Sequence, residues 1–100
     1  MRWFSCRFRS PICKAEKVRP AIVIGRSGAD LFLVPISSQL SNTAFALKEW
    51  RAAGLNVACG VKAQIATVEE RLVVKTVGLL SAADRQLLNE RLRNWLQLNS

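Results

Sequence analysis

Polar side chains that could bind a phosphate lie at the ends of predicted strands. They are one arginine, one lysine, two serines and one glutamine: Arg19, Lys62, Ser37, Ser38 and Gln64. If the strand that begins at Arg19 forms a hairpin with the strand over Leu31–Val34, Arg19 and Ser37 fall at the same edge of the sheet. A guanidinium group and a hydroxyl can together hold a phosphate, because the guanidinium fork bridges two oxygens. The alternative is that Arg19 is a surface charge at a strand end.

The residue types that the sequence lacks exclude several kinds of site. There is no histidine, so neither a Ser-His-Asp nor a Cys-His catalytic set can form. No Gly-rich loop ending in Lys-Ser or Lys-Thr is present to cradle a nucleotide phosphate. The three cysteines, Cys6, Cys13 and Cys59, do not have the spacing of a zinc site, and we expect free thiols in a reducing compartment. Since there is no cluster of carboxylates either, we expect no metal and no cofactor.

The chain is strongly basic, with 15 Lys and Arg against 7 Asp and Glu and a net charge of +8. Among the first 26 residues Glu16 is the single acid, and seven cations surround it in the sequence: Arg2, Arg7, Arg9, Lys14, Lys17, Arg19 and Arg26. Such a cluster on a small domain favours a phosphate-bearing or acidic partner. A basic face that only keeps the protein soluble is the alternative.

Length and hydrophobicity predict a single globular domain over residues 1–100, because half of the 100 residues are hydrophobic. The longest apolar runs have only about five residues, far fewer than a membrane span needs. The N-terminus contains no apolar segment of the kind found in a signal peptide. We therefore expect a cytoplasmic protein that does not contact a membrane.

Alternating side chains, apolar runs and turn residues predict a mostly antiparallel sheet. The central strand runs from Arg19 to Gly25, and Pro20 belongs at its beginning because proline has no N–H to donate. Arg26–Asp30 supplies the turn of a hairpin. The other strands are predicted over residues 3–9, 31–34, 45–47, 61–68 and 72–77.

The C-terminal part of the sequence predicts one helix. Ser81 to Asp84 has the pattern of a capping box in its acidic form, which marks a helix start. An apolar stripe that would dock this helix on the sheet follows at helical spacing: Leu88, Leu92, Trp95 and Leu96. The predicted fold class is mainly β within the α+β class, an antiparallel sheet followed by one packed C-terminal α-helix.

Five blocks of the sequence, in order and at compatible spacing, resemble the MazF/PemK/Kid family of toxins. The blocks are Lys17-Val18-Arg19-Pro20-Ala21-Ile22-Val23-Ile24, Val34-Pro35-Ile36-Ser37-Ser38, Ala53-Gly54-Leu55, Val61 to Thr67, and Val77-Gly78-Leu79-Leu80-Ser81. The resemblance implies a small, strongly curved antiparallel sheet or SH3-like half-barrel with a C-terminal helix, usually in a homodimer. It also implies the toxin of a type II toxin–antitoxin system: a metal-independent endoribonuclease that cleaves single-stranded RNA and is silenced by a cognate antitoxin protein.

The resemblance also implies residue roles. Arg19, the arginine of the Arg-Pro step, and Ser37, the hydroxyl residue after the Pro-Ile block, match the catalytic pair, where threonine is commoner at the second position. We expect further polar and basic side chains to bind RNA: Lys17, Ser38, Lys62, Gln64, Arg7 and Arg9.

Two departures from the family pattern bear on activity. The first strand is shortened, because it lacks the usual Gly-Asp start, and Ala63-Gln64 stands where some relatives carry an acidic general base. The general base is therefore not identified from the sequence. Two other functions remain open: a catalytically inactive nucleic-acid-binding module, and a CcdB-like toxin of the same fold that binds DNA gyrase without cleaving anything.

Overall fold

The structure is a computed structural model of the chain, and it describes residues 4–9 and 18–96. These ranges form the strands β1 (Phe4–Arg9), β2 (Val18–Ser27), β3 (Asp30–Ser37), β4 (Phe45–Ala46), β5 (Gly60–Val61), β6 (Ala66–Glu69) and β7 (Val73–Leu79), the helix α1 (Ala82–Leu96), and two 3-10 turns at Leu40–Asn42 and Glu70–Leu72. The predicted fold class, a mostly antiparallel sheet followed by one C-terminal helix, is confirmed.

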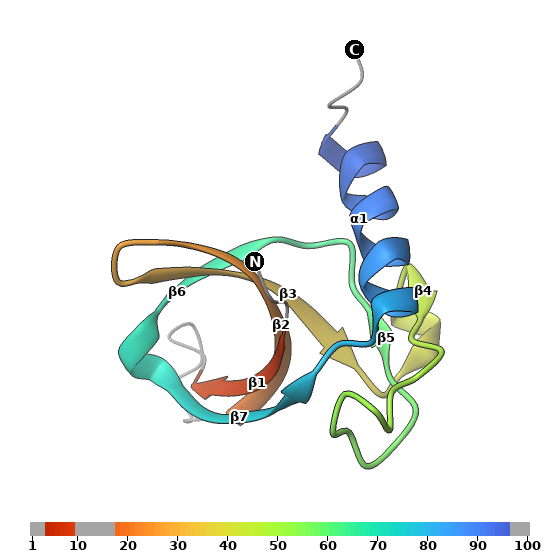
Figure 1. Ribbon diagram of the computed structural model, residues 1–100, viewed down its shortest axis with the longest axis horizontal. Coiled ribbons are helices and arrows are strands. Elements are labelled where there is room, and N and C mark those ends of the chain that lie inside the picture. Colours follow the sequence, from red (N-terminus) through yellow and green to blue (C-terminus); the bar gives the residue numbers. More distant parts are fainter. Residues whose placement is uncertain (1–3, 10–17, 97–100) are drawn as a thin grey trace.

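The sheet curves strongly. Its pairs are antiparallel in the order β4-β5-β3-β2-β1-β7, and β6 also pairs with β3. The first half of β3 pairs with β6, whereas its last two residues pair with β5. As a result β1, β2, β3, β6 and β7 form a ring, and α1 stands beside this ring next to β4 and β5 (Figure 1).

Both faces of the central strands are buried, so the described residues form two hydrophobic cores. The inner core contains no helix residue and fills the ring of strands; its buried members are Cys6, Ala21, Val23, Leu31, Leu33 and Val68. The outer core lies between the sheet and α1; its buried members are Ile22, Val34, Ile36, Leu47, Ala53, Val61, Leu80, Leu88 and Leu92. Because successive side chains of a strand point to opposite faces, neighbours such as Ala21 and Ile22 belong to different cores.

The start of α1 agrees with the predicted cap only in part. Ser81 Oγ accepts a hydrogen bond from the backbone N–H of Asp84 at 3.2 Å, as a cap requires. The Asp84 carboxylate does not complete a capping box. It is fully buried and accepts hydrogen bonds from the backbone N–H groups of Lys48 at 2.9 Å and Glu49 at 2.8 Å. Asp84 therefore ties the beginning of α1 to the segment that follows Leu47.

The apolar stripe of α1 is one residue shorter than predicted. Leu88 and Leu92 are buried in the outer core, and Trp95 packs against it. Leu96, however, is 51% exposed, so its predicted place on the stripe is wrong. The reason is visible in the arrangement of the elements, because the last turns of α1 extend beyond the strands (Figure 1).

The strand predicted over residues 61–68 is also wrong, since the structure has two short strands, β5 and β6, with residues 62–65 between them. In the β3–β5 ladder Ile36 pairs with Val61, whereas in the β3–β6 ladder Leu33 pairs with Ala66. Residues 62–65 therefore span only two positions of β3. One of these is Pro35, whose carbonyl oxygen still accepts from the N–H of Lys62 but which has no N–H to donate in return, so the β3–β5 ladder stops after this bond.

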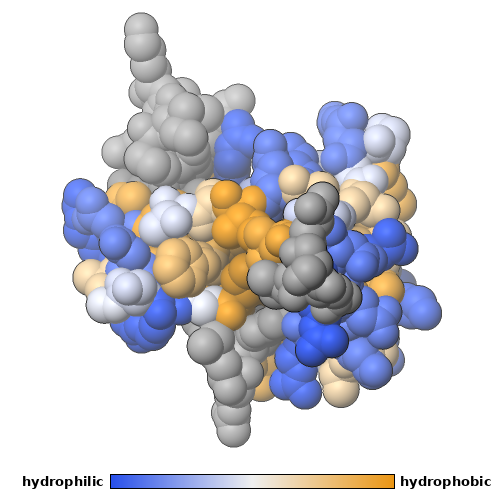
Figure 2. Space-filling model, turned by 90° about the horizontal axis from the view of Figure 1, so that it is seen from above, coloured by the Kyte–Doolittle hydropathy of each residue, from blue (hydrophilic) through white to orange (hydrophobic). Residues whose placement is uncertain are grey.

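Large hydrophobic side chains remain exposed among the described residues: Val18, Phe32, Leu40, Val57, Ile65, Val74, Leu79 and Leu96. Figure 2 shows the molecule from above relative to Figure 1. On this face hydrophobic side chains gather in the middle and hydrophilic ones flank them. A gathering of this kind is typical of a surface that contacts a partner.

Candidate functional site

Arg19 is the second residue of β2 and lies at one end of the sheet. Pro20 pushes the residue before it into an extended conformation, so the backbone of Arg19 is held in the strand. This backbone pairs with Phe8 of β1. The Arg19 side chain is exposed to solvent, where a ligand can reach it.

Ser37 is the last residue of β3, and the hairpin brings it to the same end of the sheet as Arg19. The β2–β3 ladder ends where Ala21 pairs with Pro35, and Arg19 and Ser37 each lie two residues beyond this pair. Since side chains alternate along a strand, both residues lie on the face that carries Ala21, which is the face of the inner core. The predicted hairpin, with both residues at one edge, is thus confirmed, while their catalytic roles stay a prediction.

The Ser37 hydroxyl has a defined hydrogen-bonding partner. Ser37 is half-buried, and its Oγ accepts a hydrogen bond from the backbone N–H of Gln39 at 3.1 Å. A hydroxyl oxygen has two lone pairs and one proton, and one lone pair is engaged here. The proton is therefore available to a ligand oxygen.

Lys62 comes from the neighbouring strand end. Its backbone N–H donates to the carbonyl oxygen of Pro35 at 2.9 Å, which continues the β3–β5 ladder by one position and puts Lys62 on the face that carries Ser37. Two residues later the N–H of Gln64 donates to the Lys62 carbonyl oxygen at 2.8 Å and closes a tight turn. Three strand ends therefore bring a guanidinium, a hydroxyl and an ammonium group to one end of one face.

Arg7 lies on the opposite face of the sheet. It is exposed, and its backbone pairs with Pro20 on one side and Lys75 on the other. Because Pro20 and Arg19 are neighbours, their side chains alternate between the two faces, and Arg7 shares the face of Pro20. Any contact that Arg7 makes with RNA therefore belongs to a different surface from the one that carries Arg19.

The other residues expected to bind RNA are placed as follows. Ser38 and Gln64 are exposed next to the site, the first directly after β3 and the second in the turn after β5. Arg9 ends β1, where its backbone pairs with Val18. Lys17 lies outside the described residues.

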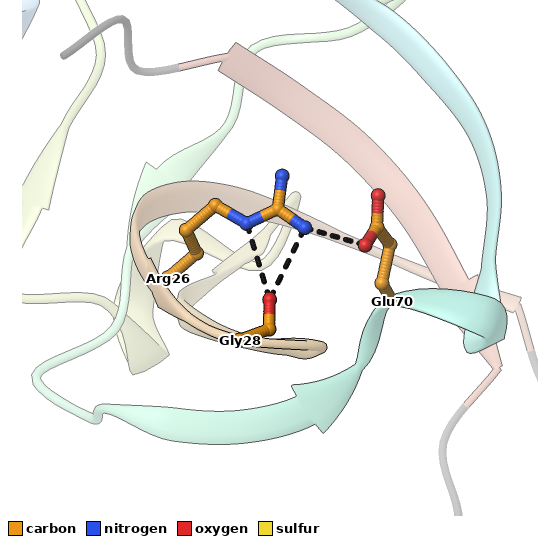
Figure 3. Close-up of polar contacts among 3 residues, drawn as sticks. All are labelled: Arg26, Gly28 and Glu70. Atoms are coloured by element: carbon orange, nitrogen blue, oxygen red, sulfur yellow. Dashed lines mark hydrogen bonds and ion pairs between the residues drawn. The ribbon is translucent and has the colours of Figure 1, made fainter.

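Acidic side chains that are paired lie away from these strand ends. Arg26 and Glu70 form an ion pair at 2.5 Å at the opposite end of the β2–β3 ladder, where Arg26 also donates to the carbonyl oxygen of Gly28 (Figure 3). Glu69 pairs with Arg71. In residues 4–9 and 18–96 there is no group of three or more Cys, Asp or Glu that could hold a metal ion.

The buried cysteines do not supply a nucleophile. Burial raises the pKa of the Cys6 thiol to about 11, and desolvation by burial also raises the pKa of Cys59. The thiolate is the reactive form of cysteine, so both thiols stay protonated and unreactive at neutral pH. The chemistry that the site offers is therefore hydrogen bonding and positive charge directed at a phosphate.

The sequence analysis missed the hydrogen-bonded turn that supports Ser37. Asn42 Nδ2 donates to Gln39 Oε1 at 2.9 Å, within the 3-10 turn that follows β3. A signal for the turn exists, because a run of Ser, Asn and Thr after a strand is typical of turns in which side chains bond to the backbone.

Comparison with known proteins identifies the family. A family model described as "PemK-like, MazF-like toxin of type II toxin-antitoxin system" matches residues 4–96. The chain belongs to this toxin family. Among solved structures it is similar to the Mycobacterium tuberculosis toxin MazF-mt6, with 19% sequence identity and a TM-score of 0.71 over 93% of this chain and 97% of that chain. At this identity the likeness supports the fold. None of the curated proteins matches the sequence.

Membership of the MazF-like family confirms the resemblance carried by the five sequence blocks. It makes this protein a toxin of a type II toxin–antitoxin system, and such a system implies an antitoxin as partner. Within the part of the chain that the structure describes, no helix is long and apolar enough to cross a membrane.

Proposed function

We propose that this MazF-like toxin is a metal-independent endoribonuclease that cleaves single-stranded RNA. The observation that supports this most is the β2–β3 pairing, which brings Arg19 and Ser37 to one end and one face of the hairpin. Lys62 adds a second cation at the neighbouring strand end. A guanidinium, a hydroxyl and an ammonium group can together bind a phosphodiester and stabilise the charge that develops during its cleavage.

Cleavage without a metal begins when the 2′-hydroxyl oxygen attacks the adjacent phosphorus. A base takes the 2′ proton, the bond from phosphorus to the 5′ oxygen breaks, and the protonated base or water gives a proton to the leaving 5′ oxygen. The products end in a 2′,3′-cyclic phosphate and a 5′-hydroxyl. Arg19 stabilises the phosphorane and donates a hydrogen bond to the leaving oxygen, while the Ser37 hydroxyl donates a hydrogen bond to a non-bridging oxygen. Loss of one such donor typically raises the barrier by about 3 kcal/mol.

The remaining residues bind the RNA in this proposal. Ser38 and Gln64 flank the reacting phosphate, and Lys17 and Arg9 contact the sugar–phosphate backbone of the RNA. Arg7, together with Lys75, forms a second basic area on the opposite face. Because phosphate contacts of this kind carry no sequence information, they position the RNA and do not select the cleavage motif.

The assembly is part of the same proposal. The exposed hydrophobic side chains favour a homodimer in which like surfaces of two copies meet. A protein antitoxin then silences the toxin, and both act in the cytoplasm, where single-stranded mRNA is present.

Arg19→Ala tests the proposal directly. The thermal midpoint should stay near that of the parent, because truncating an exposed side chain usually changes stability by less than about 0.5 kcal/mol. Cleavage of mixed-sequence RNA in the presence of a chelator should fall by roughly 100-fold or more, while binding falls far less. Ser37→Ala should have a milder effect of the same kind, and Ser37→Thr should retain activity. Arg85→Ala, which removes an exposed arginine of α1, is the matched control and should cut RNA normally.

Other outcomes would point to the alternative functions. If the parent binds RNA and never cuts it, the protein is an inactive RNA-binding module; the absence of an acid in the turn at Ala63-Gln64 favours this alternative. If the parent neither binds nor cuts RNA, a toxin that acts by contact with another protein remains.

A further inference from the structure

In the turn after β3, Asn42 donates two hydrogen bonds to Gln39. Asn42 Nδ2 donates to the side-chain oxygen of Gln39 at 2.9 Å, and the backbone N–H of Asn42 donates to the Gln39 carbonyl oxygen at 3.0 Å. The N–H of Gln39 in turn donates to Ser37 Oγ at 3.1 Å. The position of Asn42 is thereby connected to the orientation of the Ser37 hydroxyl through one residue.

The far end of the turn returns to the strand beside Ser37. The N–H and the hydroxyl of Thr43 both donate to the carbonyl oxygen of Leu40, at 3.2 and 2.7 Å. Thr43 also packs so closely on Gly60 that a Cβ there would overlap Thr43 Oγ1. Gly60 of β5 pairs with Ser37 of β3. The contacts that begin at Ser37 and run through the turn to Thr43 therefore return to Ser37 by way of Gly60.

The side chains that make this turn contribute little to the hydrophobic cores. Gln39, Leu40 and Asn42 are exposed, and none of the buried core residues lies in the turn. Exposed hydrogen bonds add little stability, because water can replace either partner. What the bonds do supply is a fixed geometry next to a hydroxyl.

Resting on the RNA cleavage proposed above, we propose that Asn42 is a positioning residue for Ser37. It braces Gln39, whose N–H occupies one lone pair of the Ser37 oxygen and leaves the hydroxyl proton directed at the phosphate. A donor that is already oriented stabilises a transition state better than one that must rotate, because no reorganisation is needed as the charge develops.

Kinetics of the full-length protein with a defined single-stranded RNA test this role. Asn42→Ala should lower kcat by about threefold to tenfold, the change expected for one hydrogen bond, with KM and the thermal midpoint unchanged. Asn42→Leu, which is close in size but has no group that can hydrogen-bond to the Gln39 side chain, should have the same effect. Ser41→Ala is the matched control in the same turn and should leave kcat unchanged.

A double-mutant cycle separates positioning from an independent role. In a Ser37→Ala background, Asn42→Ala should have no further effect on kcat, because the hydroxyl through which it acts is absent. If Asn42→Ala lowers kcat by the same factor with and without Ser37, or does not lower it in the parent, the proposal is wrong.

Amide hydrogen exchange gives a readout that does not depend on cleavage. In the parent the Gln39 amide should exchange slowly, and both Ser37→Ala and Asn42→Ala should make it exchange faster. If Asn42→Ala leaves Gln39 exchange unchanged, Asn42 does not brace the turn and the inference fails. If the parent cuts no RNA, the proposed function fails, and the exchange experiment alone decides whether Asn42 positions Ser37.

Discussion

The two hydrophobic cores of this toxin are built in different ways. The inner core consists of side chains that alternate along the strands, and the strand registers fix their neighbours. The outer core needs α1 and the segment after Leu47, which a single buried carboxylate, Asp84, holds together. Because Arg19 and Ser37 lie on the face of the inner core, we expect the site to depend on the ring of strands more than on the helix.

Truncating one fully buried leucine in each core should have the largest effect on stability. Leu33→Ala in the inner core and Leu88→Ala in the outer core should each lower the free energy of unfolding by about 3 kcal/mol, because both remove buried methyl groups and leave a cavity. The two variants should differ in which part of the protein opens more easily. Leu88→Ala should speed hydrogen exchange first in α1 and residues 47–54, whereas Leu33→Ala should speed it throughout the strands and reduce RNA cleavage more.

Leu96→Ala is the control for the helix. Since half of this side chain is exposed, the change should lower the free energy of unfolding by no more than about 0.5 kcal/mol. If Leu88→Ala instead speeds hydrogen exchange equally in the helix and in every strand, the two cores unfold as one cooperative unit and do not differ in local stability.

Asp84→Ala tests whether the carboxylate holds the outer core together. It removes the acceptor of two backbone N–H groups, those of Lys48 and Glu49, and should lower the free energy of unfolding by about 2 kcal/mol in urea titrations. Asp84→Asn keeps one acceptor oxygen but turns an NH2 group toward the other backbone N–H, so it should also lower the free energy of unfolding. Losses below about 0.5 kcal/mol for both variants would mean that these hydrogen bonds are not what attaches the segment to α1.

The hairpin that carries the site follows from local sequence patterns. Apolar runs over residues 20–24 and 31–34, with turn residues between them, are enough to predict the pairing of the two strands and to put Arg19 and Ser37 at one edge. The turn residues do not fix the pairing along the whole hairpin, because a register shift between Val23 and Gly25 changes it by one residue before the ladder reaches the end that carries Arg19 and Ser37. What the two residues do with RNA stays a prediction.

The features that sequence analysis missed depend on residues far apart in the chain. The break between β5 and β6 depends on Pro35 in a different strand, so the pattern of residues 61–68 does not contain it. Asp84 resembles a capping residue within its own helix, and only the fold brings Lys48 and Glu49 to it. The brace of Asn42 on Gln39 is local, but an amide pair three residues apart is too common a pattern to signal a role.

The ion pair that joins the β2–β3 hairpin to the turn before β7 should have the smallest effect. Arg26 and Glu70 are each 55% exposed, so their coupling in a double-mutant cycle of Arg26→Gln and Glu70→Gln should be at most about 1 kcal/mol and should decrease with salt. The hairpin stays attached without the pair, because the backbone N–H of Glu70 also donates to the carbonyl oxygen of Ala29 at 2.7 Å. RNA cleavage should not change, since Arg19 lies at the other end of the ladder. A coupling above about 2 kcal/mol that persists in 1 M salt would contradict this. The ring around the inner core would then depend on a long-range side-chain contact, just as the outer core depends on Asp84.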